Sequence, residues 1–172
     1  WEDDKDNNGK FQVYARGFYK GGCEKFPVKT VNIDPGGQQL KPRVGIADDG
    51  TFVVVWEDDR DNNGSFQVRA ARFTAMGVKK SLDFTVNTNA NRQQLKPDIA
   101  VAPNGNFVVA WEDDSNGATG VYQIFARGFN ANGTQRFPAI TVNRNANGQQ
   151  LKPAVGIAAN GSFAVTWEDD SD

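Results

Sequence analysis

The sequence predicts an all-β protein whose repeat units are blades of a β-propeller, each blade a sheet of four antiparallel strands. Three observations predict this fold class. A unit of 55 or 56 residues occurs three times along the 172 residues. Within a unit, apolar residues alternate with a period of two rather than 3.6, and glycine-containing turns separate short β-branched runs.

The repeat is marked most clearly by Trp-Glu-Asp-Asp, whose four copies begin at Trp1, Trp56, Trp111 and Trp167. Gln-Gln-Leu-Lys-Pro and Val-Asn recur with the same steps of 55 and 56 residues. We therefore expect one repeat domain over 1–172. Its units span about 1–55, 56–110 and 111–166. Residues 167–172 begin a fourth unit, as expected for a piece of a longer array.

The second unit shows the four expected strands best. They span about 42–47, 52–56, 66–70 and 84–87. Asp49-Gly50 joins the first two, because glycine supplies the positive φ of a tight hairpin turn. The second strand, Phe-Val-Val-Val-Trp, is apolar at adjacent positions, so neighbouring blades must cover both of its faces. We expect the first strand to be innermost, where Gly45 and Ala47 suit the limited space.

The two ends of the chain carry complementary halves of one blade. The N-terminal part supplies a third and a fourth strand (11–32), and the C-terminal part supplies a first and a second strand (153–170). A closed ring of three blades would need wedges of about 120°, which packed sheets cannot fill. We therefore expect head-to-tail assembly of the chain with itself into a ring, with a homodimer of six blades favoured over a homotrimer of nine.

Composition excludes several classes of function. The formal net charge is -2 and no tract is rich in Lys and Arg, so we expect neither nucleic-acid binding nor membrane insertion. The chain has no His and one Cys, which excludes a His-ligated zinc site and a Cys-His pair within it. Cys23 has no partner for an intrachain disulfide, and we assign it no role.

The order of these features resembles the propeller repeats of secreted or surface-attached bacterial proteins. The resemblance is carried by a Pro-led strand of small residues, a glycine turn, Phe-Val-Val-x-Trp, an Asp/Asn/Gly loop and Gln-Val-Tyr-Ala-Arg-Gly-Phe. Residues 48–52, Asp-Asp-Gly-Thr-Phe, are loosely similar to the Asp-box turn of sialidases without its leading Ser. The resemblance implies four-stranded blades and an extracellular or cell-surface location.

Polar residues gather in the connections at one end of the predicted ring. We expect this end to bind a glycan or a protein, and to do so multivalently because the units are alike. The candidate ligand-binding residues are Glu57, Asp58, Asp59, Glu112, Asp113, Asp114, Gln39, Gln94 and Gln150. Structural roles stay open beside this one, since the glutamines can bond loop backbone and the glutamates can pair with Lys41, Lys96 and Lys152.

The acidic loops are also similar to the first half of a calcium loop. Alternating oxygen side chains before a glycine occur at Asp4, Asp6 and Asn8, and again at Asp59, Asp61 and Asn63. A complete loop closes with a bidentate Glu, where this chain has Ala, and the third copy from Asp114 to Gly120 breaks the spacing. We favour simple Asx turns, keep calcium as the alternative and expect no other cofactor.

Repetition also bears on catalysis. Adjacent carboxylates recur in every unit, whereas an active site normally has one asymmetric constellation, so we expect the chain not to be an enzyme. Trp56 and Trp111 are expected in the core, with sugar stacking as the alternative. The sequence thus predicts a non-enzymatic module that presents a polar face to a ligand. The alternatives are a purely structural self-assembling scaffold and a glycosidase-like propeller.

Overall fold

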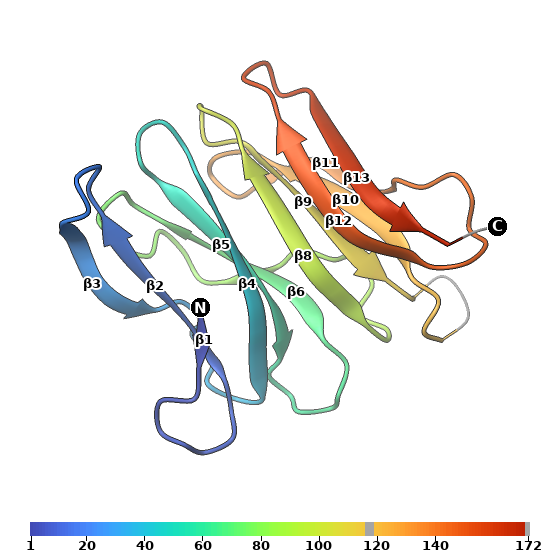
Figure 1. Cartoon of the computed structure of the whole chain (residues 1–172), viewed down its shortest axis with the longest axis horizontal. Coiled ribbons are helices and arrows are strands. Elements are labelled where there is room, and N and C mark those ends of the chain that lie inside the picture. Colours follow the sequence, from blue (N-terminus) through green and yellow to red (C-terminus); the bar gives the residue numbers. More distant parts are fainter. Residues whose placement is uncertain (116–118, 171–172) are drawn as a thin grey trace.

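The computed structural model describes residues 1–115 and 119–170, and all regular structure in these ranges is β-strand (Figure 1). None of the described segments forms a helix long and apolar enough to cross a membrane. The strands are β1 (Glu2–Asp3), β2 (Gln12–Phe18), β3 (Glu24–Thr30), β4 (Gln38–Ile46), β5 (Phe52–Asp59), β6 (Gln67–Phe73), β7 (Phe84–Thr85), β8 (Gln94–Val101), β9 (Phe107–Asp113), β10 (Gln123–Phe129), β11 (Gln135–Thr141), β12 (Gln150–Ile157) and β13 (Phe163–Asp169).

These strands form four antiparallel sheets, called blades 1 to 4 in chain order, which lie side by side (Figure 1). Blade 2 (β4 to β7) and blade 3 (β8 to β11) are complete four-stranded sheets. In the described ranges, blade 1 (β1 to β3) has no first strand and only the end of a second one, and blade 4 (β12 and β13) consists of a first and a second strand. The predicted all-β architecture is therefore confirmed, with half-blades at the two ends.

The second strand of a blade runs further than the sequence predicted. β5 continues through Trp-Glu-Asp-Asp to Asp59, because its last residues stay paired with β4 and with β6. β4 begins earlier than predicted, at Gln38, and a β-bulge between Leu40 and Arg43 interrupts its pairing with β5. Lys41 at this bulge has a φ of 48°, in the left-handed region that non-glycine residues rarely adopt.

Complete blades bury both faces of their second strand, as predicted. Along β5, Val54 and Trp56 pack toward blade 1, whereas Val53 and Val55 pack toward blade 3. Trp56 is 0% exposed and Trp111 is 1% exposed, which confirms that these tryptophans belong to the core. The hydrophobic core is thus a series of layers between blades.

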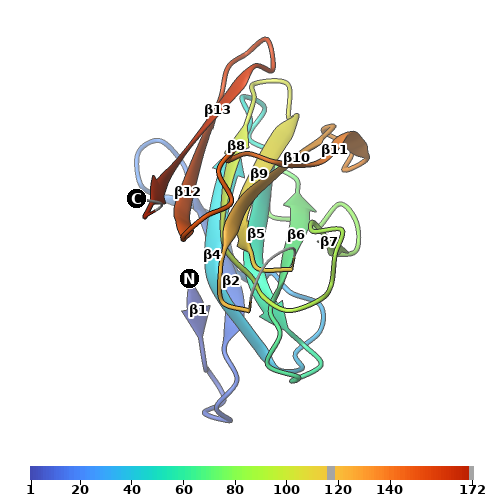
Figure 2. The same cartoon turned by 90° about the vertical axis from the view of Figure 1, so that its right-hand side faces the viewer.

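The first strands of successive blades lie against one another. Figure 2 shows β4, β8 and β12 on one side of the row of blades and β7 and β11 on the other. A Cβ atom added to Gly45 would lie only 2.5 Å from Cγ2 of Val101 in the next blade. The small residues of these strands therefore allow the close approach that an innermost position requires.

Glycines on the third strands make room for aromatic rings. A Cβ atom on Gly17 would lie 2.0 Å from the ring of Phe26, and one on Gly128 would lie 2.1 Å from the ring of Phe137. The Phe137 ring then stacks on Phe163 of blade 4, with centroids 5.3 Å apart. Each aromatic ring thereby connects the fourth strand of its blade to the next blade.

Blade 2 lacks this arrangement. Arg72 occupies the position of the two glycines in the repeat, and the fourth strand, β7, has only the two residues Phe84–Thr85 instead of the predicted 84–87. Residues 74–83 instead form a turn and an irregular segment, with an isolated bridge between Phe73 and Lys79.

We expect Gly128→Ala to lower the free energy of unfolding by about 1–3 kcal/mol, the usual range for overpacking a core. The added methyl group would displace the Phe137 ring from its stack on Phe163. Gly21→Ala is the matched control, because a Cβ atom there meets nothing within 4 Å. Urea denaturation compares the two variants, and equal midpoints would contradict this packing argument.

Candidate functional site

A buried network of side-chain amides joins each blade to the next. Between blades 2 and 3, Nδ2 of Asn87 donates to Oε1 of Gln67 at 2.7 Å, to the Asn89 carbonyl at 2.7 Å and to Oε1 of Gln94 at 3.3 Å. Its Oδ1 accepts the backbone N–H of Val68 at 2.9 Å. Asn87 is 5% exposed and Gln94 is 0% exposed, so these bonds replace water for the buried amide groups.

Gln94 extends this amide network into the next blade. Its Nε2 donates to the Asn91 carbonyl at 2.9 Å and to Oδ1 of Asp113 at 3.4 Å. The other two junctions repeat the arrangement with Gln12, Asn32, Gln39 and Asp58, and with Gln123, Asn143, Gln150 and Asp169. The glutamines thus bond loop backbone and a carboxylate inside the protein, which was one of the structural roles left open by the sequence.

The glutamates of Trp-Glu-Asp-Asp form a second inter-blade contact. Oε1 of Glu57 accepts the backbone N–H of Lys96 in blade 3 at 2.7 Å, and both Glu57 oxygens lie 3.2 Å from Nζ of Lys41. Glu112 likewise accepts the N–H of Lys152 at 2.7 Å and pairs with Nζ of Lys96 at 3.1 Å. The left-handed φ of these lysines, between 46° and 52°, accompanies the contact in every case.

The predicted ligand-binding carboxylates lie inside the fold instead of on a loop face. They are buried because Trp-Glu-Asp-Asp belongs to the second strand, and the next blade covers it. Exposures are 5% or less for Glu57, Asp58, Asp59, Glu112, Asp113 and Asp114, and 0% for Gln39, Gln94 and Gln150. Their predicted placement on an accessible surface is wrong, and their observed contacts are structural.

The two loops that are similar to calcium loops are closed by their own hydrogen bonds. The Asp59 carboxylate accepts the N–H of Asn63 at 2.9 Å and of Gly64 at 3.1 Å, and Asp61 accepts Nδ2 of Asn63 at 2.7 Å. Asp4, Asp6 and Asn8 repeat these bonds in the first unit. Asn63 forms an Asx turn, because its Oδ1 accepts the N–H of Ser65 at 2.7 Å, and Asn8 does the same with the N–H of Lys10 at 2.8 Å. Among the described residues, no group of three or more acidic, His or Cys side chains is arranged to hold a metal ion.

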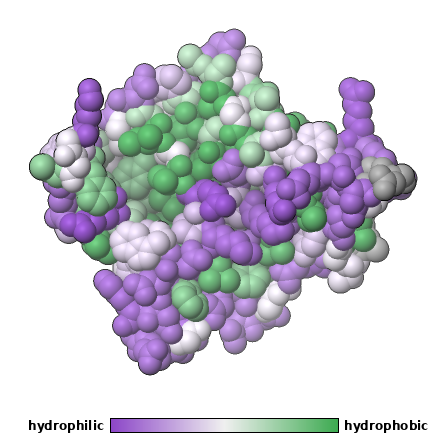
Figure 3. Space-filling view, in the orientation of Figure 1, coloured by the Kyte–Doolittle hydropathy of each residue, from purple (hydrophilic) through white to green (hydrophobic). Residues whose placement is uncertain are grey.

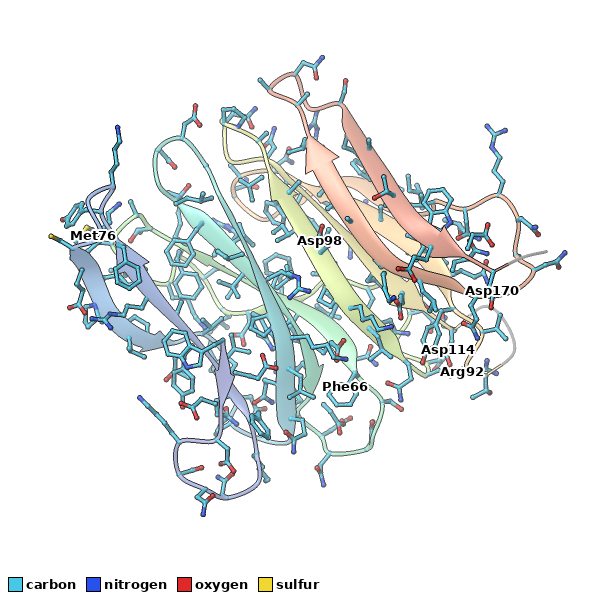
Figure 4. The ribbon with its side chains drawn as sticks, viewed as in Figure 1. Phe66, Met76, Arg92, Asp98, Asp114 and Asp170 are labelled. Carbon is cyan, nitrogen blue, oxygen red and sulfur yellow. The ribbon has the colours of Figure 1, made fainter. Side chains whose placement is uncertain are left out.

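In the third loop, part of the sequence pattern (116–118) falls outside the described residues. The Asp114 carboxylate accepts the N–H of Gln93 at 2.8 Å and of Gly120 at 2.9 Å. Figure 4 shows Arg92 beside Asp114, where its guanidinium donates to the Asp114 carbonyl at 3.2 Å. This carboxylate therefore connects the loop of blade 3 to the chain entering that blade.

A charged cluster that the sequence did not indicate lies at the junction of blades 1 and 2. Asp58 pairs with Arg60 at 2.6 Å, and Lys79 pairs with Asp83 at 3.6 Å. Burial raises the pKa of Asp58 above its ordinary value, although the hydrogen bond from Arg60 opposes this. Burial likewise lowers the pKa of Lys79 and of Arg69. Lys79 and Asp83 come from the irregular segment of blade 2, which follows no repeat pattern.

An open groove is the second feature that the sequence did not indicate. It is a cavity of about 680 Å³ between β2 of blade 1 and β4 and β5 of blade 2. Its lining residues include Tyr14, Phe18, Arg43, Val44 and Ile46. Figure 3 shows it as a hollowed apolar area on the side of blades 1 and 2. Val44 and Ile46 are each 65% exposed there, although their repeat positions are apolar in every unit.

Comparison with known proteins supports the fold. No family model and no curated protein matches the chain. Among solved structures, the chain is similar to an α-L-arabinanase of Penicillium chrysogenum complexed with arabinobiose, with a TM-score of 0.61 and 14% identity. The match covers 91% of this chain and 49% of the arabinanase. A thermostable family-43 glycoside hydrolase matches with a TM-score of 0.48 and 14% identity, over 94% of this chain and 62% of the hydrolase.

The arabinanase is a β-propeller and the chain forms four-stranded antiparallel sheets, so the predicted propeller blades are confirmed. The chain spans about half the length of the arabinanase. The prediction that the chain is not an enzyme is contradicted, because the arabinanase with the similar fold is a glycoside hydrolase. Recurrence of the same carboxylates in every unit was not a sound reason to exclude catalysis, since most of those carboxylates are structural and leave other positions for chemistry. The similarity to bacterial surface proteins and to the Asp-box stays a prediction.

Replacing Asn87 with Ala should destabilise the protein strongly. The change leaves the buried N–H of Val68 and Oε1 of Gln67 without their partner, at about 1–3 kcal/mol for each buried group. Asn91→Ala is the control, because this exposed neighbour contributes its backbone carbonyl, not its side chain, to Gln94. Guanidinium denaturation measures both, and similar losses in the two variants would show that the amide network is dispensable.

The Asp58 carboxyl should make stability depend on pH. The pKa of Asp58 is raised in the folded state. Its favourable contribution to the free energy of unfolding is therefore complete below the ordinary carboxyl pKa, and it is lost as pH rises through the raised pKa. Asp58→Asn removes this loss, so the Tm of the variant relative to that of the native chain should increase with pH.

Thermal unfolding between about pH 3 and pH 7 brackets the carboxyl range and tests this. Asp49→Asn is the control of opposite sign, since hydrogen bonds from Thr51 lower the pKa of Asp49. Its contribution is lost as pH falls, so the Tm of this variant relative to the native chain should decrease with pH. Parallel curves for the native chain and Asp58→Asn would refute the assignment.

Proposed function

We propose that this chain is a carbohydrate-binding propeller module that contacts its ligand with the loops at one end of the blades. These are the loops between the second and third strands and the connections that lead into β4, β8 and β12. The observation that carries the proposal is the rigidity of this end. Nε2 of Gln93 donates to the Gly64 carbonyl at 2.6 Å, and its Oε1 accepts the Phe66 N–H at 3.1 Å.

This glutamine fixes the loop of one blade against the connection into the next, and Gln38 and Gln149 do the same at the other junctions. The exposed tips carry mainly amide side chains, such as Asn62 and Asn91. Amide groups both donate to and accept from sugar hydroxyls. Because these bonds order the described parts of the loops, little conformational entropy is lost there when a ligand binds.

Two further arguments support a carbohydrate as the ligand class. The arabinanase with a similar fold was solved with arabinobiose bound, which makes arabinose-containing glycans the first candidates. The loops recur in every unit, so a polymer with repeated sugars can engage several of them at once and gain avidity. Such polymers are met outside cells, which agrees with the extracellular or cell-surface location that the resemblance to bacterial surface proteins implies.

Isothermal titration with arabinobiose and with longer arabinan fragments tests this proposal. We expect longer fragments to bind more tightly, and we expect Asn62→Ala combined with Asn91→Ala to weaken binding about tenfold or more, the loss of one to two net hydrogen bonds. Asn104→Ala is the matched control, because this amide lies in the turn between β8 and β9 at the other end of the blades.

Release of reducing ends should be followed in the same samples, because the structural neighbours are hydrolases. Turnover would extend the module to a glycosidase-like propeller. A folded chain that binds none of a wide panel of glycans would contradict the proposal and favour the self-assembling scaffold.

A further inference from the structure

We propose that the open groove between β2 and β4 receives the strand pair β12–β13 of a second copy of this chain, with Glu168 of that copy accepting the backbone N–H of Lys41. Blade 1 would thereby gain the first and second strands that it lacks. The inference is independent of carbohydrate binding and rests on contacts that the other junctions already show.

The first argument is the exposed face of β12–β13. Apart from Lys152 at the bulge and Asp169 at the strand end, the exposed residues of this pair occupy repeat positions that face the following blade: Ala154, Gly156, Ala164, Thr166 and Glu168. In β9, the repeat counterparts of Ala164, Thr166 and Glu168 are Val108, Ala110 and Glu112. These three are 1%, 0% and 0% exposed because blade 4 covers them. One face of β12–β13 therefore has the residues that other blades bury against the following blade.

The groove is the complementary face. Val44 and Ile46 of β4 correspond to Ile99 and Val101 of β8, which pack on the second strand of the preceding blade. At 65% exposure, Val44 and Ile46 have no such strand pair to pack on. A second copy would place small side chains of β12–β13 there, in the same way as blade 2 packs on β8.

An unpaired strand edge supplies the third argument. β6 is paired with β5 over its whole length, from Phe73 to Gln67. Within the part of blade 1 that the structure describes, the corresponding edge of β2 pairs with β1 at Gln12 and Val13, and Tyr14 bonds the backbone of Trp1. By the repeat, β13 would align Phe163 with Phe18 and continue along the free edge. Unpaired edges of this kind readily accept another strand.

The inter-blade glutamate contact fixes the register of this docking. The N–H groups of Lys96 and Lys152 each bond a glutamate of the preceding blade at 2.7 Å. Lys41 has the same left-handed conformation, but its N–H makes no such bond to the described part of blade 1. Two glutamates of the series remain: Glu2 lies in β1, at the place that Glu168 would take, and Glu168 has a side chain that is 62% exposed. The Glu168 carboxylate of the second copy would thus accept the hydrogen bond from the Lys41 backbone N–H.

β1 competes for the same place. Glu2 and Asp3 pair with Val13 and Gln12, the residues that Glu168 and Asp169 would face in the shared blade. Trp1 also stacks on Tyr14, with ring centroids 5.9 Å apart. β1 holds two residue pairs, whereas β13 offers seven by analogy with β5 and β6. Docking therefore requires β1 to leave, and removing β1 should promote assembly.

Each copy contributes two complete blades and one shared blade to such a ring. Two copies would give six blades and three would give nine, of which six lies within the usual range of four to eight. The interface is heterologous, because the groove and the strand pair are different surfaces of one chain.

Multi-angle light scattering of the native chain and of a variant lacking residues 1–4 measures the assembly. We expect two or three times 18.8 kDa, with the truncated variant assembled at lower concentration. Ile46→Lys should give monomers, while Leu82→Lys, at a 76% exposed site outside the groove, should not. Monomers of both the native and the truncated chain at about 100 μM would overturn the proposal, since stable interfaces bind more tightly than this.

Mixing two blocked variants tests the head-to-tail geometry. Ile46→Lys blocks the groove and Thr166→Lys blocks the strand pair, so each alone should be monomeric while an equimolar mixture should form a dimer through one intact interface. No dimer in the mixture would overturn the heterologous interface.

Glu168→Ala should raise the dissociation constant about tenfold or more, whereas Glu168→Gln, which retains an acceptor oxygen, should raise it less. Equal constants for Glu168→Ala and the native chain would refute the Lys41 contact.

Discussion

The amide network between blades is the constraint on which the rest of the structure depends. Asn87 bonds the third strand of its own blade through Val68 and Gln67, and Gln94 carries the connection to the next blade. The amide groups carry no charge and do not titrate, so the bonds between them persist across a wide range of pH. Apolar layers supply the attraction between blades, whereas the directional amide bonds determine how each blade is seated.

The glutamate contact always joins a blade to the one that follows it in the chain. Glu57 lies on a second strand and bonds the bulged first strand of the following blade, never that of the preceding one. The same strand must therefore extend past Trp56 to deliver its glutamate, which explains why Trp-Glu-Asp-Asp is strand and not loop. The exposed amides of the proposed ligand-binding loops lie outside this motif, with Asn62 after it and Asn91 in the connection into β8.

Much of the fold could be predicted because repetition, a period of two and turn glycines all point to the same blade. The site could not, because hydropathy does not distinguish a polar residue in water from one that is buried and hydrogen-bonded. Gln39 and Glu57 were therefore expected on a surface although they are buried. The left-handed φ of Lys41 has no sequence signal, since glycine is the usual residue in that conformation. The fourth strand of each of blades 1 to 3 ends at a Thr just before Val-Asn, whereas the sequence placed its end at the Asn.

Near-identical units create a risk of mispairing, because a strand that slips by one whole unit meets almost the same partners. The charged cluster at the first junction counters this risk. Asp83 accepts the N–H of Ile33, and Lys79 donates to the Val31 carbonyl, so blade 1 finds these bonds on blade 2 alone. The junction of blades 3 and 4 has a different specific contact, because Asp98 accepts the Val155 N–H at 2.8 Å. Lys79, Asp83 and Asp98, which do not follow the repeat, therefore favour the correct order of otherwise similar blades during folding.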